Sequence, residues 1–129
     1  MKRIVAIVVG VLMALTLSVG AAEARTIPYP TKPPKQYTIW ERGTVGFMEF
    51  YRGNASDLWR DRVSFTAYNG DVAKKKLWFR VRIKCFNPIS GKTLSHDGKW
   101  VTGNGAESKA TCRWYETGRN ATNQWKVRR

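Results

Sequence analysis

The chain has 129 residues, of which 23 are Lys or Arg and 9 are Asp or Glu, so its formal net charge at pH 7 is +14. This length supports one domain with a single modest hydrophobic core and excludes two. The charge excess predicts a soluble surface that attracts polyanions without selecting a particular partner.

Residues 1–24 have the layout of a secretory signal peptide. The basic pair after Met1 precedes an uncharged run over residues 4–22, and the tripeptide AEA, which ends at Ala24, suits a signal peptidase. Cleavage there would leave a secreted, extracellular chain of 105 residues with 21 basic and 8 acidic side chains and no transmembrane segment. The competing interpretation is a retained membrane anchor, because 19 uncharged residues lie near the lower limit for crossing a bilayer.

Residues 25–35 contain four of the five prolines, in the stretch TIPYPTKPPK. Such a composition favours extended polyproline II backbone and donates few backbone hydrogen bonds. We therefore expect residues 25–35 to form an extended arm and residues 36–129 to form one β domain.

Period-two patterning without a convincing helix runs through the rest of the chain. QYTIWER and TVGFMEFYR are rich in aromatic and β-branched residues, and RDRVSFTAY sets Val63, Phe65 and Ala67 on one face. DVAKKK could form a single helical turn. About eight short strands, separated by Gly, Asn and Asp, predict an all-β fold, a small antiparallel β-sandwich or barrel.

The stretch LWFRVRIKCF, residues 77–86, is the clearest predicted strand. Its alternate residues form an unbroken apolar row that should face the core: Leu77, Phe79, Val81, Ile83 and Cys85. The residues between them should then face solvent: Trp78, Arg80, Arg82, Lys84 and Phe86. Three cations in line, bracketed by aromatic rings, are an unusual surface for a strand.

Downstream, KTLSH and KWVT flank Asp97-Gly98, a strong hairpin signal. ESKATCRWYE places Ser108, Ala110, Cys112 and Trp114 on one side of a further strand, and NQWKVRR closes the chain. Cys85 and Cys112 are the only cysteines, so an exported chain should join them in a disulfide. A metal-binding pair is the weaker alternative, since there is no CxxC motif and only one histidine.

The outward cations predict a binding surface. Residues two apart on one strand face lie about 6.5–7 Å apart, a spacing that can follow an extended polyanion, and aromatic rings add stacking or cation–π contacts. The competing interpretation is a solvated strand face whose cations pair with acids on neighbouring strands. The candidate ligand-binding residues are Trp78, Arg80, Arg82, Lys84, Phe86, Arg60, Arg62, Lys126 and Arg128.

Catalytic motifs are absent from the sequence. His96 adjoins the predicted hairpin turn, where a solvated loop residue is expected, and a triad of Ser90 or Ser95 with His96 and Asp97 lacks a nucleophile-elbow pattern. Basic secreted ribonucleases resemble the chain only in size and charge. We expect no catalytic residue, no cofactor and no metal site.

The stretch GKWVTGNGAESKATC, residues 98–112, resembles small exported proteins of Gram-positive bacteria that carry G-x-W-V, a glycine turn, a serine and a cysteine closing a single disulfide. Lactococcin-972-like bacteriocins are similar in being small exported β-sandwiches rich in Trp and Tyr. The resemblance covers about a quarter of the mature chain and implies export and β structure, with no residue-specific activity.

Together these features predict a secreted, non-enzymatic, basic binding module for an anionic polymer or surface. Its target would be a cell-wall polymer, an anionic glycan, lipid headgroups or nucleic acid. The alternative is an antagonistic protein, either bacteriocin-like or an inhibitor of an extracellular enzyme, with that enzyme as its extracellular protein target. A small secreted hydrolase is the third hypothesis.

Overall fold

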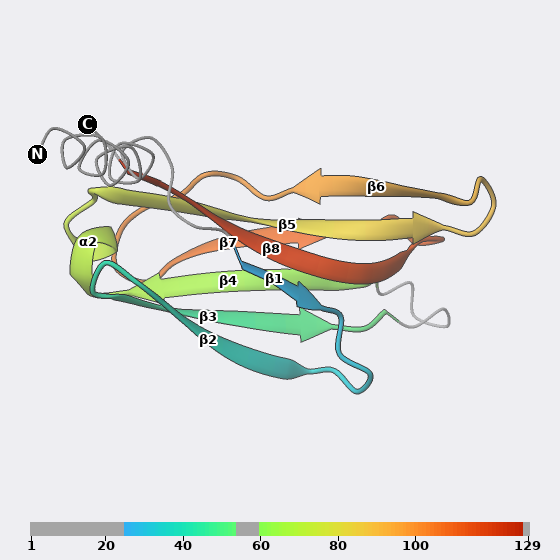
Figure 1. The fold of residues 1–129 in the computed structure, drawn as a ribbon, viewed down its shortest axis with the longest axis horizontal. Helices are drawn as coiled ribbons and strands as arrows, with labels where there is room; N and C mark the ends of the chain where they lie inside the picture. The colour runs from blue at the N-terminus through green and yellow to red at the C-terminus, as the bar shows by residue number, and fades with distance from the viewer. Residues whose placement is uncertain (1–24, 54–59, 128–129) are drawn as a thin grey trace, which may run out of the picture.

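The computed structural model describes residues 25–53 and 60–127, which form two four-stranded antiparallel sheets packed face to face (Figure 1). The sheets do not close on each other, so the predicted all-β sandwich is confirmed and the barrel alternative is not. The predicted signal peptide and Arg128 lie outside the described residues. In chain order the elements are β1 (Arg25–Pro28), β2 (Lys35–Glu41), β3 (Thr44–Tyr51), β4 (Arg62–Tyr68), the short helix α2 (Gly70–Ala73), β5 (Leu77–Asn87), β6 (Lys92–Asp97), β7 (Ala106–Thr111) and β8 (Thr117–Val127).

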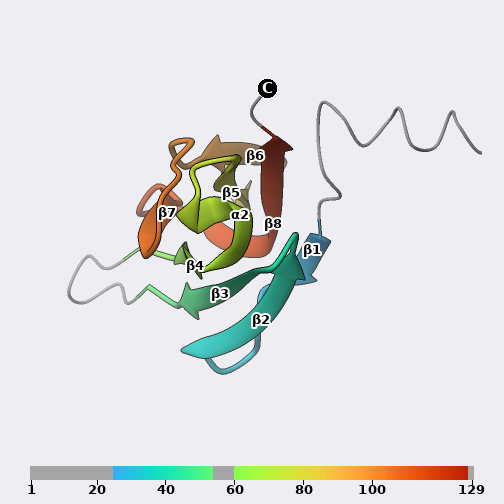
Figure 2. The same ribbon diagram turned by 90° about the vertical axis from the view of Figure 1, so that its left-hand side faces the viewer.

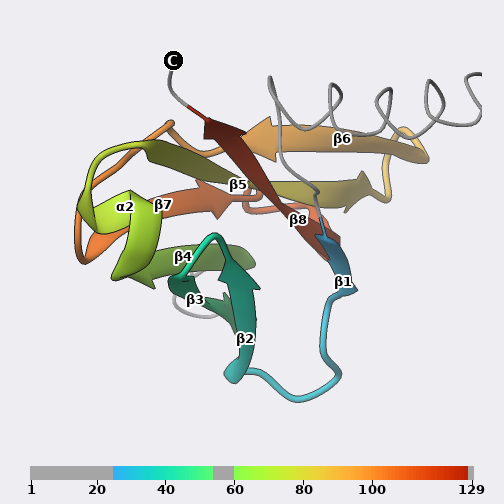
Figure 3. The same ribbon diagram turned by 60° about the vertical axis from the view of Figure 1, so that its left-hand side comes forward.

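The first sheet has the strand order β1-β8-β5-β6 and the second has the order β2-β3-β4-β7. Figures 2 and 3 show the two layers from other sides, with α2 at the end where β4 passes to β5. This helix confirms the single turn expected in DVAKKK. Within the described residues, no helix has the length and apolar character needed to cross a membrane. β5 and β8, the two longest strands, pair with each other at the centre of the first sheet.

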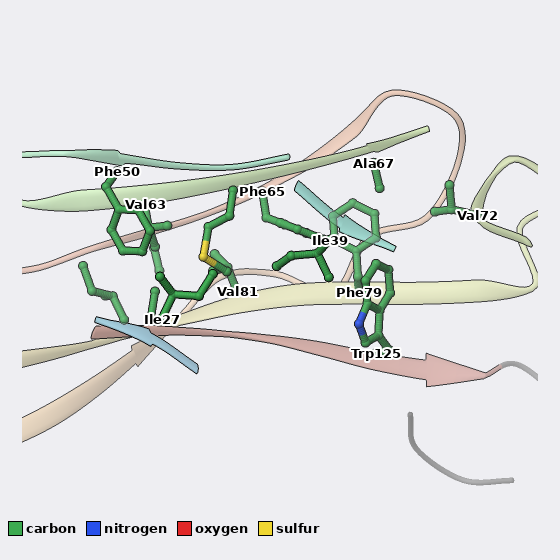
Figure 4. Packing of buried hydrophobic residues seen from close by; sticks show 14 of the residues in the cluster. Ile27, Ile39, Phe50, Val63, Phe65, Ala67, Val72, Phe79, Val81 and Trp125 are labelled. Carbon is green, nitrogen blue, oxygen red and sulfur yellow. The ribbon is translucent and has the colours of Figure 1, made fainter. Parts of the chain in front are cut away.

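The core lies between the sheets and is built from the inward residues of each strand (Figure 4). At its centre, Phe65 of β4 packs edge-on against Phe79 of β5 and Trp125 of β8, with ring centroids 5.2 and 5.4 Å apart. All three side chains are at most 2% exposed. Edge-to-face contacts of this kind favour one relative placement of the two sheets.

The predicted disulfide is present and joins the two sheets. Cys85 lies in β5 and Cys112 directly follows β7, with a Cα–Cα distance of 5.8 Å. Ser108, Ala110 and Cys112 are buried on one side, as predicted. Trp114 does not continue this row, because β7 ends at Thr111 and the chain turns; its side chain is 68% exposed.

The N-terminal segment belongs to the domain, which corrects the arm predicted over residues 25–35. β1 pairs antiparallel with β8, and Ile27, only 5% exposed, is part of the core. Pro28 is tolerated because β1 is an edge strand, where a missing N–H need not break the sheet. The prediction of extended backbone from the proline-rich composition is therefore correct for β1. The prediction that this segment is separate from the domain is wrong.

The hairpin turn predicted at Asp97-Gly98 is also wrong. β5 and β6 form the hairpin, closed by residues 88–91 with Asn87 opposite Lys92. Asp97 ends β6, and the chain then continues along the same edge of β5 instead of turning back. Gly98 instead lies where its backbone closely approaches that of Lys109.

Candidate binding face of the first sheet

The outer face of the first sheet, the side turned away from the second sheet, carries the predicted row of β5. Its members are half-buried or exposed, whereas the residues that alternate with them between Leu77 and Cys85 are buried. At about 3.3 Å of rise per residue the row extends about 26 Å. In order along the strand it consists of Trp78, Arg80, Arg82, Lys84 and Phe86.

One carboxylate contacts both arginines of the row. Asp97 lies directly opposite Arg82, whose Nε and Nη2 donate to its two oxygens at 2.6 and 3.1 Å. Arg80 Nη2 lies 3.4 Å from Asp97 Oδ2. The hydrogen bond with Arg82 holds the pKa of the Asp97 carboxyl below its usual value, and the same bond raises the pKa of Arg82. The cross-strand pairing expected under the competing interpretation therefore exists for both arginines, but Lys84 forms no ion pair among the described residues.

Arg80 is also held from the other side. Its Nε donates to Gln124 Oε1 at 2.6 Å, and these two residues face each other across β5 and β8. With one neighbour on β8 and one on β6, the guanidinium is fixed in direction. Fixed side chains lose less conformational entropy when a ligand binds.

Trp100, which is not among the candidate residues predicted from the sequence, completes one end of the row. Arg80 Cζ lies 4.7 Å and Lys126 Nζ 4.5 Å from the centroid of the Trp100 ring, distances within the range of cation–π contacts. A hollow of about 270 Å³ opens beside it, lined by Trp78, Trp100, Lys126 and Val127.

A β-bulge places Trp100 there. Between the pairs Arg82–Asp97 and Phe79–Val101, β5 has two residues and the facing segment has three, so the facing segment contains one extra residue. The bulge needs glycine at its start: a Cβ on Gly98 would lie 2.5 Å from the backbone carbonyl oxygen of Lys109. Gly98 thus allows two backbone segments to approach closely, and it does not form the predicted turn.

The other end of the row has a similar pairing of ring and cation. Arg119 Cζ lies 4.6 Å from the centroid of the Phe86 ring. In the register of β5 and β8, Lys84 faces Asn120 and Cys85 faces Gly118, so Arg119 is the extra residue of a second bulge. This position depends on register across strands, and no local pattern in the sequence indicates it.

Of the remaining candidate cations, only some lie on this face. Lys126 lies on it, in contact with Trp100. Arg62 lies in β4 of the second sheet and stacks on Tyr51, with Cζ 4.5 Å from the ring centroid, so it belongs to the opposite outer face. Arg60 is exposed just before β4. Arg62 therefore faces outward on the other sheet and does not share a face with the row of β5, and Arg60 precedes a strand of that other sheet.

His96 is not the solvated loop residue that the sequence indicated. It lies in β6, its side chain is 23% exposed, and Nε2 is 2.9 Å from Glu116 Oε1. Glu116 is fully buried and also accepts the backbone N–H of Arg113 at 2.8 Å. Cys85 Sγ lies within 4.8 Å of both groups, but its disulfide bond removes it as a metal ligand. Asp97 pairs with Arg80 and Arg82, and His96 contacts Glu116 instead. The Ser-His-Asp triad considered from the sequence therefore does not form.

In comparisons with known proteins, no family model, no curated protein and no solved structure matches the chain, so the resemblance noted over residues 98–112 stays a prediction.

Proposed function

We propose that the protein is an exported, non-enzymatic module that binds an extended anionic polymer along the outer face of the first sheet. The observation that carries this proposal is the imbalance of charge on that face. Among the residues that the structure describes, five cationic side chains lie there with a single acid, Asp97. The five are Arg80, Arg82, Lys84, Arg119 and Lys126.

The geometry supports a linear ligand. Arg80, Arg82 and Lys84 follow one another at the two-residue repeat of a strand, about 6.5–7 Å, so successive charges of an extended polymer could meet successive cations. Trp78 and Trp100 at one end and Phe86 at the other offer apolar ring surface beyond the charges. A ligand that combines negative charge with flat apolar faces, such as an anionic glycan or a nucleic acid strand, fits this arrangement.

Side chains that can form hydrogen bonds lie beside the cations, on the two strands that flank β5. Gln124 and Thr122 of β8 are half-buried on the outer face, and Thr122 Oγ1 is 2.9 Å from Thr26 Oγ1 of β1. On the other flank, Ser95 of β6 lies opposite Lys84 and is exposed. Hydroxyl and amide groups can donate to and accept from sugar hydroxyls, which favours an anionic glycan over a polyphosphate chain as the ligand.

The disulfide supports action outside the cytoplasm, because structural disulfides persist in oxidising compartments. A secreted location fits the predicted signal peptide.

The test is binding to a sulfated glycan, to poly(glycerol phosphate) and to a single-stranded oligonucleotide over a series of salt concentrations. Changing Arg80, Arg82 and Lys84 together to Ser should weaken binding and flatten the slope of log affinity against log salt, by about one unit per lost contact for the oligonucleotide. The melting temperature should fall only slightly, because the ion pairs with Asp97 that are lost are partly exposed.

The matched control changes Lys74, Lys75 and Lys76 to Ser. These exposed lysines follow α2 and carry the same total charge. Equal weakening in both triple variants would assign binding to net charge and would refute a role for the face.

A further inference from the structure

Within residues 25–53 and 60–127, two turns at one end of the sandwich carry the most exposed large apolar side chains outside the strands. Residues 87–92 join β5 to β6, and residues 112–116 join β7 to β8. Because the end of β5 pairs with the start of β8, the two turns are neighbours, at the end opposite α2 in Figure 1. Ile89 is 83% exposed and Trp114 is 68% exposed. We call residues 87–92 and 112–116 the turn end.

The structure holds Trp114 on a fixed turn. The turn begins at Cys112, which the disulfide fastens to β5. It closes where the Glu116 N–H donates to the Arg113 carbonyl at 2.9 Å, while the buried Glu116 carboxylate accepts the Arg113 N–H at 2.8 Å. Trp114 rests edge-on against Tyr115, with ring centroids 5.5 Å apart. An indole presented this way loses little further freedom when it binds.

Among the described residues, the exposed charge around these tips has one sign. Lys92 and Arg113 lie in the turns, and Arg119 lies just beyond. None of these three forms an ion pair among the described residues. The acid of the turns, Glu116, has a fully buried side chain. The turn end therefore presents apolar tips within a cationic surface.

The opposite end of the sandwich differs. Trp40 is 69% exposed there, as much as Trp114, but acids accompany it: Glu41 follows it directly, and Asp71 lies nearby in α2, paired with Arg42. Three exposed lysines, Lys74, Lys75 and Lys76, also follow α2 at that end. Exposed tryptophan and cations therefore occur at both ends. Among the described residues the turn end is distinguished by its acid, because Glu116 is buried, whereas Glu41 and Asp71 are partly exposed.

We propose that the turn end docks onto the surface of an anionic lipid bilayer. Trp114 and Ile89 enter the interface between headgroups and acyl chains, where an indole is favoured, and Lys92 and Arg113 contact the lipid phosphates. Trp114, Ile89, Lys92 and Arg113 are not part of the face proposed to bind a polymer, and Arg119 lies where the two surfaces meet.

The experiment is co-sedimentation of the full exported chain with vesicles of equimolar phosphatidylglycerol and phosphatidylcholine, compared with vesicles of phosphatidylcholine alone. The protein should bind the anionic vesicles and leave the neutral ones. Trp114→Ala and Ile89→Ser should each weaken binding, with about tenfold expected for the indole. The matched control, Trp40→Ala, removes an equally exposed indole from the other end and should change binding less than twofold.

A second readout follows the indole itself. Brominated acyl chains should quench part of the tryptophan fluorescence of the wild type, and Trp114→Ala should abolish that part. Absence of binding to anionic vesicles, or equal weakening by Trp40→Ala and Trp114→Ala, would overturn the proposal. Trp114→Ala should still bind the soluble anionic polymer, so failure of the bilayer proposal and failure of the polymer proposal give different results.

Discussion

Arg82 and Asp97 face each other across β5 and β6 and make a two-point contact, with 2.6 Å between Nε and Oδ1 and 3.1 Å between Nη2 and Oδ2. The same carboxylate is 3.4 Å from Arg80. Asp97 therefore aligns two cations of the outer face while neutralising part of their charge. An acid in this position should stabilise the sheet slightly and oppose binding of a polyanion.

Asp97→Asn should consequently strengthen polymer binding. Removing one negative charge about 5 Å from a bound anionic group should raise affinity by about three- to fivefold at low salt, and the gain should fade as salt is added. Titration against the sulfated glycan measures it. Glu107→Gln makes the same change of charge on β7 of the second sheet and should leave affinity nearly unchanged; a comparable gain there would mean that only net charge matters.

Stability should depend on pH through the same residue. The pKa of Asp97 is lower in the folded protein than its ordinary value of 3.8, chiefly because of the hydrogen bond from Arg82. A carboxyl with a lowered pKa stabilises the fold fully above its unfolded-state pKa, and this contribution is lost as pH falls through the folded-state pKa. The wild type should thus exceed Asp97→Asn in unfolding free energy by less than about 1 kcal/mol at neutral pH, because the pair is partly exposed.

Thermal unfolding of both proteins between about pH 6 and pH 2 tests this. The difference should be constant down to about pH 4 and should vanish below it. A difference that persists at the lowest pH would show that the asparagine acts through packing and not through lost charge.

The two faces of β5 should respond oppositely to truncation. Ile83 is fully buried, so Ile83→Ala should lower the free energy of unfolding by about 2–5 kcal/mol. Lys84 is the next residue and is exposed, so Lys84→Ser should change it by about 0.5 kcal/mol or less. Urea denaturation of both variants distinguishes them. The reverse order would mean that the register is shifted by one residue, since such a shift exchanges the faces.

The register of β5 could be predicted because five consecutive inward positions are apolar, and only a strand of period two satisfies them all. The disulfide followed from the cysteine count. Prediction from neighbouring residues in the sequence failed where a residue contacts a part of the chain that is distant in sequence. Asp97-Gly98 has the composition of a turn, yet Gly98 is required by its approach to Lys109 in β7. Likewise, the proline content around Ile27 concealed a short edge strand.

The candidate face was predictable only along one strand. Alternation identifies the cations of β5, because it concerns neighbours in sequence. Trp100 reaches the face through one extra residue in the segment after β6, Arg119 through a bulge in β8, and Asp97 through cross-strand register. Arg62 alternates in the same way as Arg82, but its strand lies in the other sheet, which no local pattern reveals.

Replacing both Cys85 and Cys112 by Ala should destabilise the domain strongly. The disulfide closes a loop over a sequence separation of 27 and ties β5 of the first sheet to the end of β7 in the second. In the chain-entropy model its removal should lower the free energy of unfolding by about 3–4 kcal/mol, a large part of the stability of a domain this small. Urea denaturation of the double variant measures the loss, and wild type unfolded with a reducing agent present should show a similar one. A loss in the double variant alone would assign the effect to packing of the two buried side chains. A loss in neither would mean that the other contacts between the sheets suffice to hold them together.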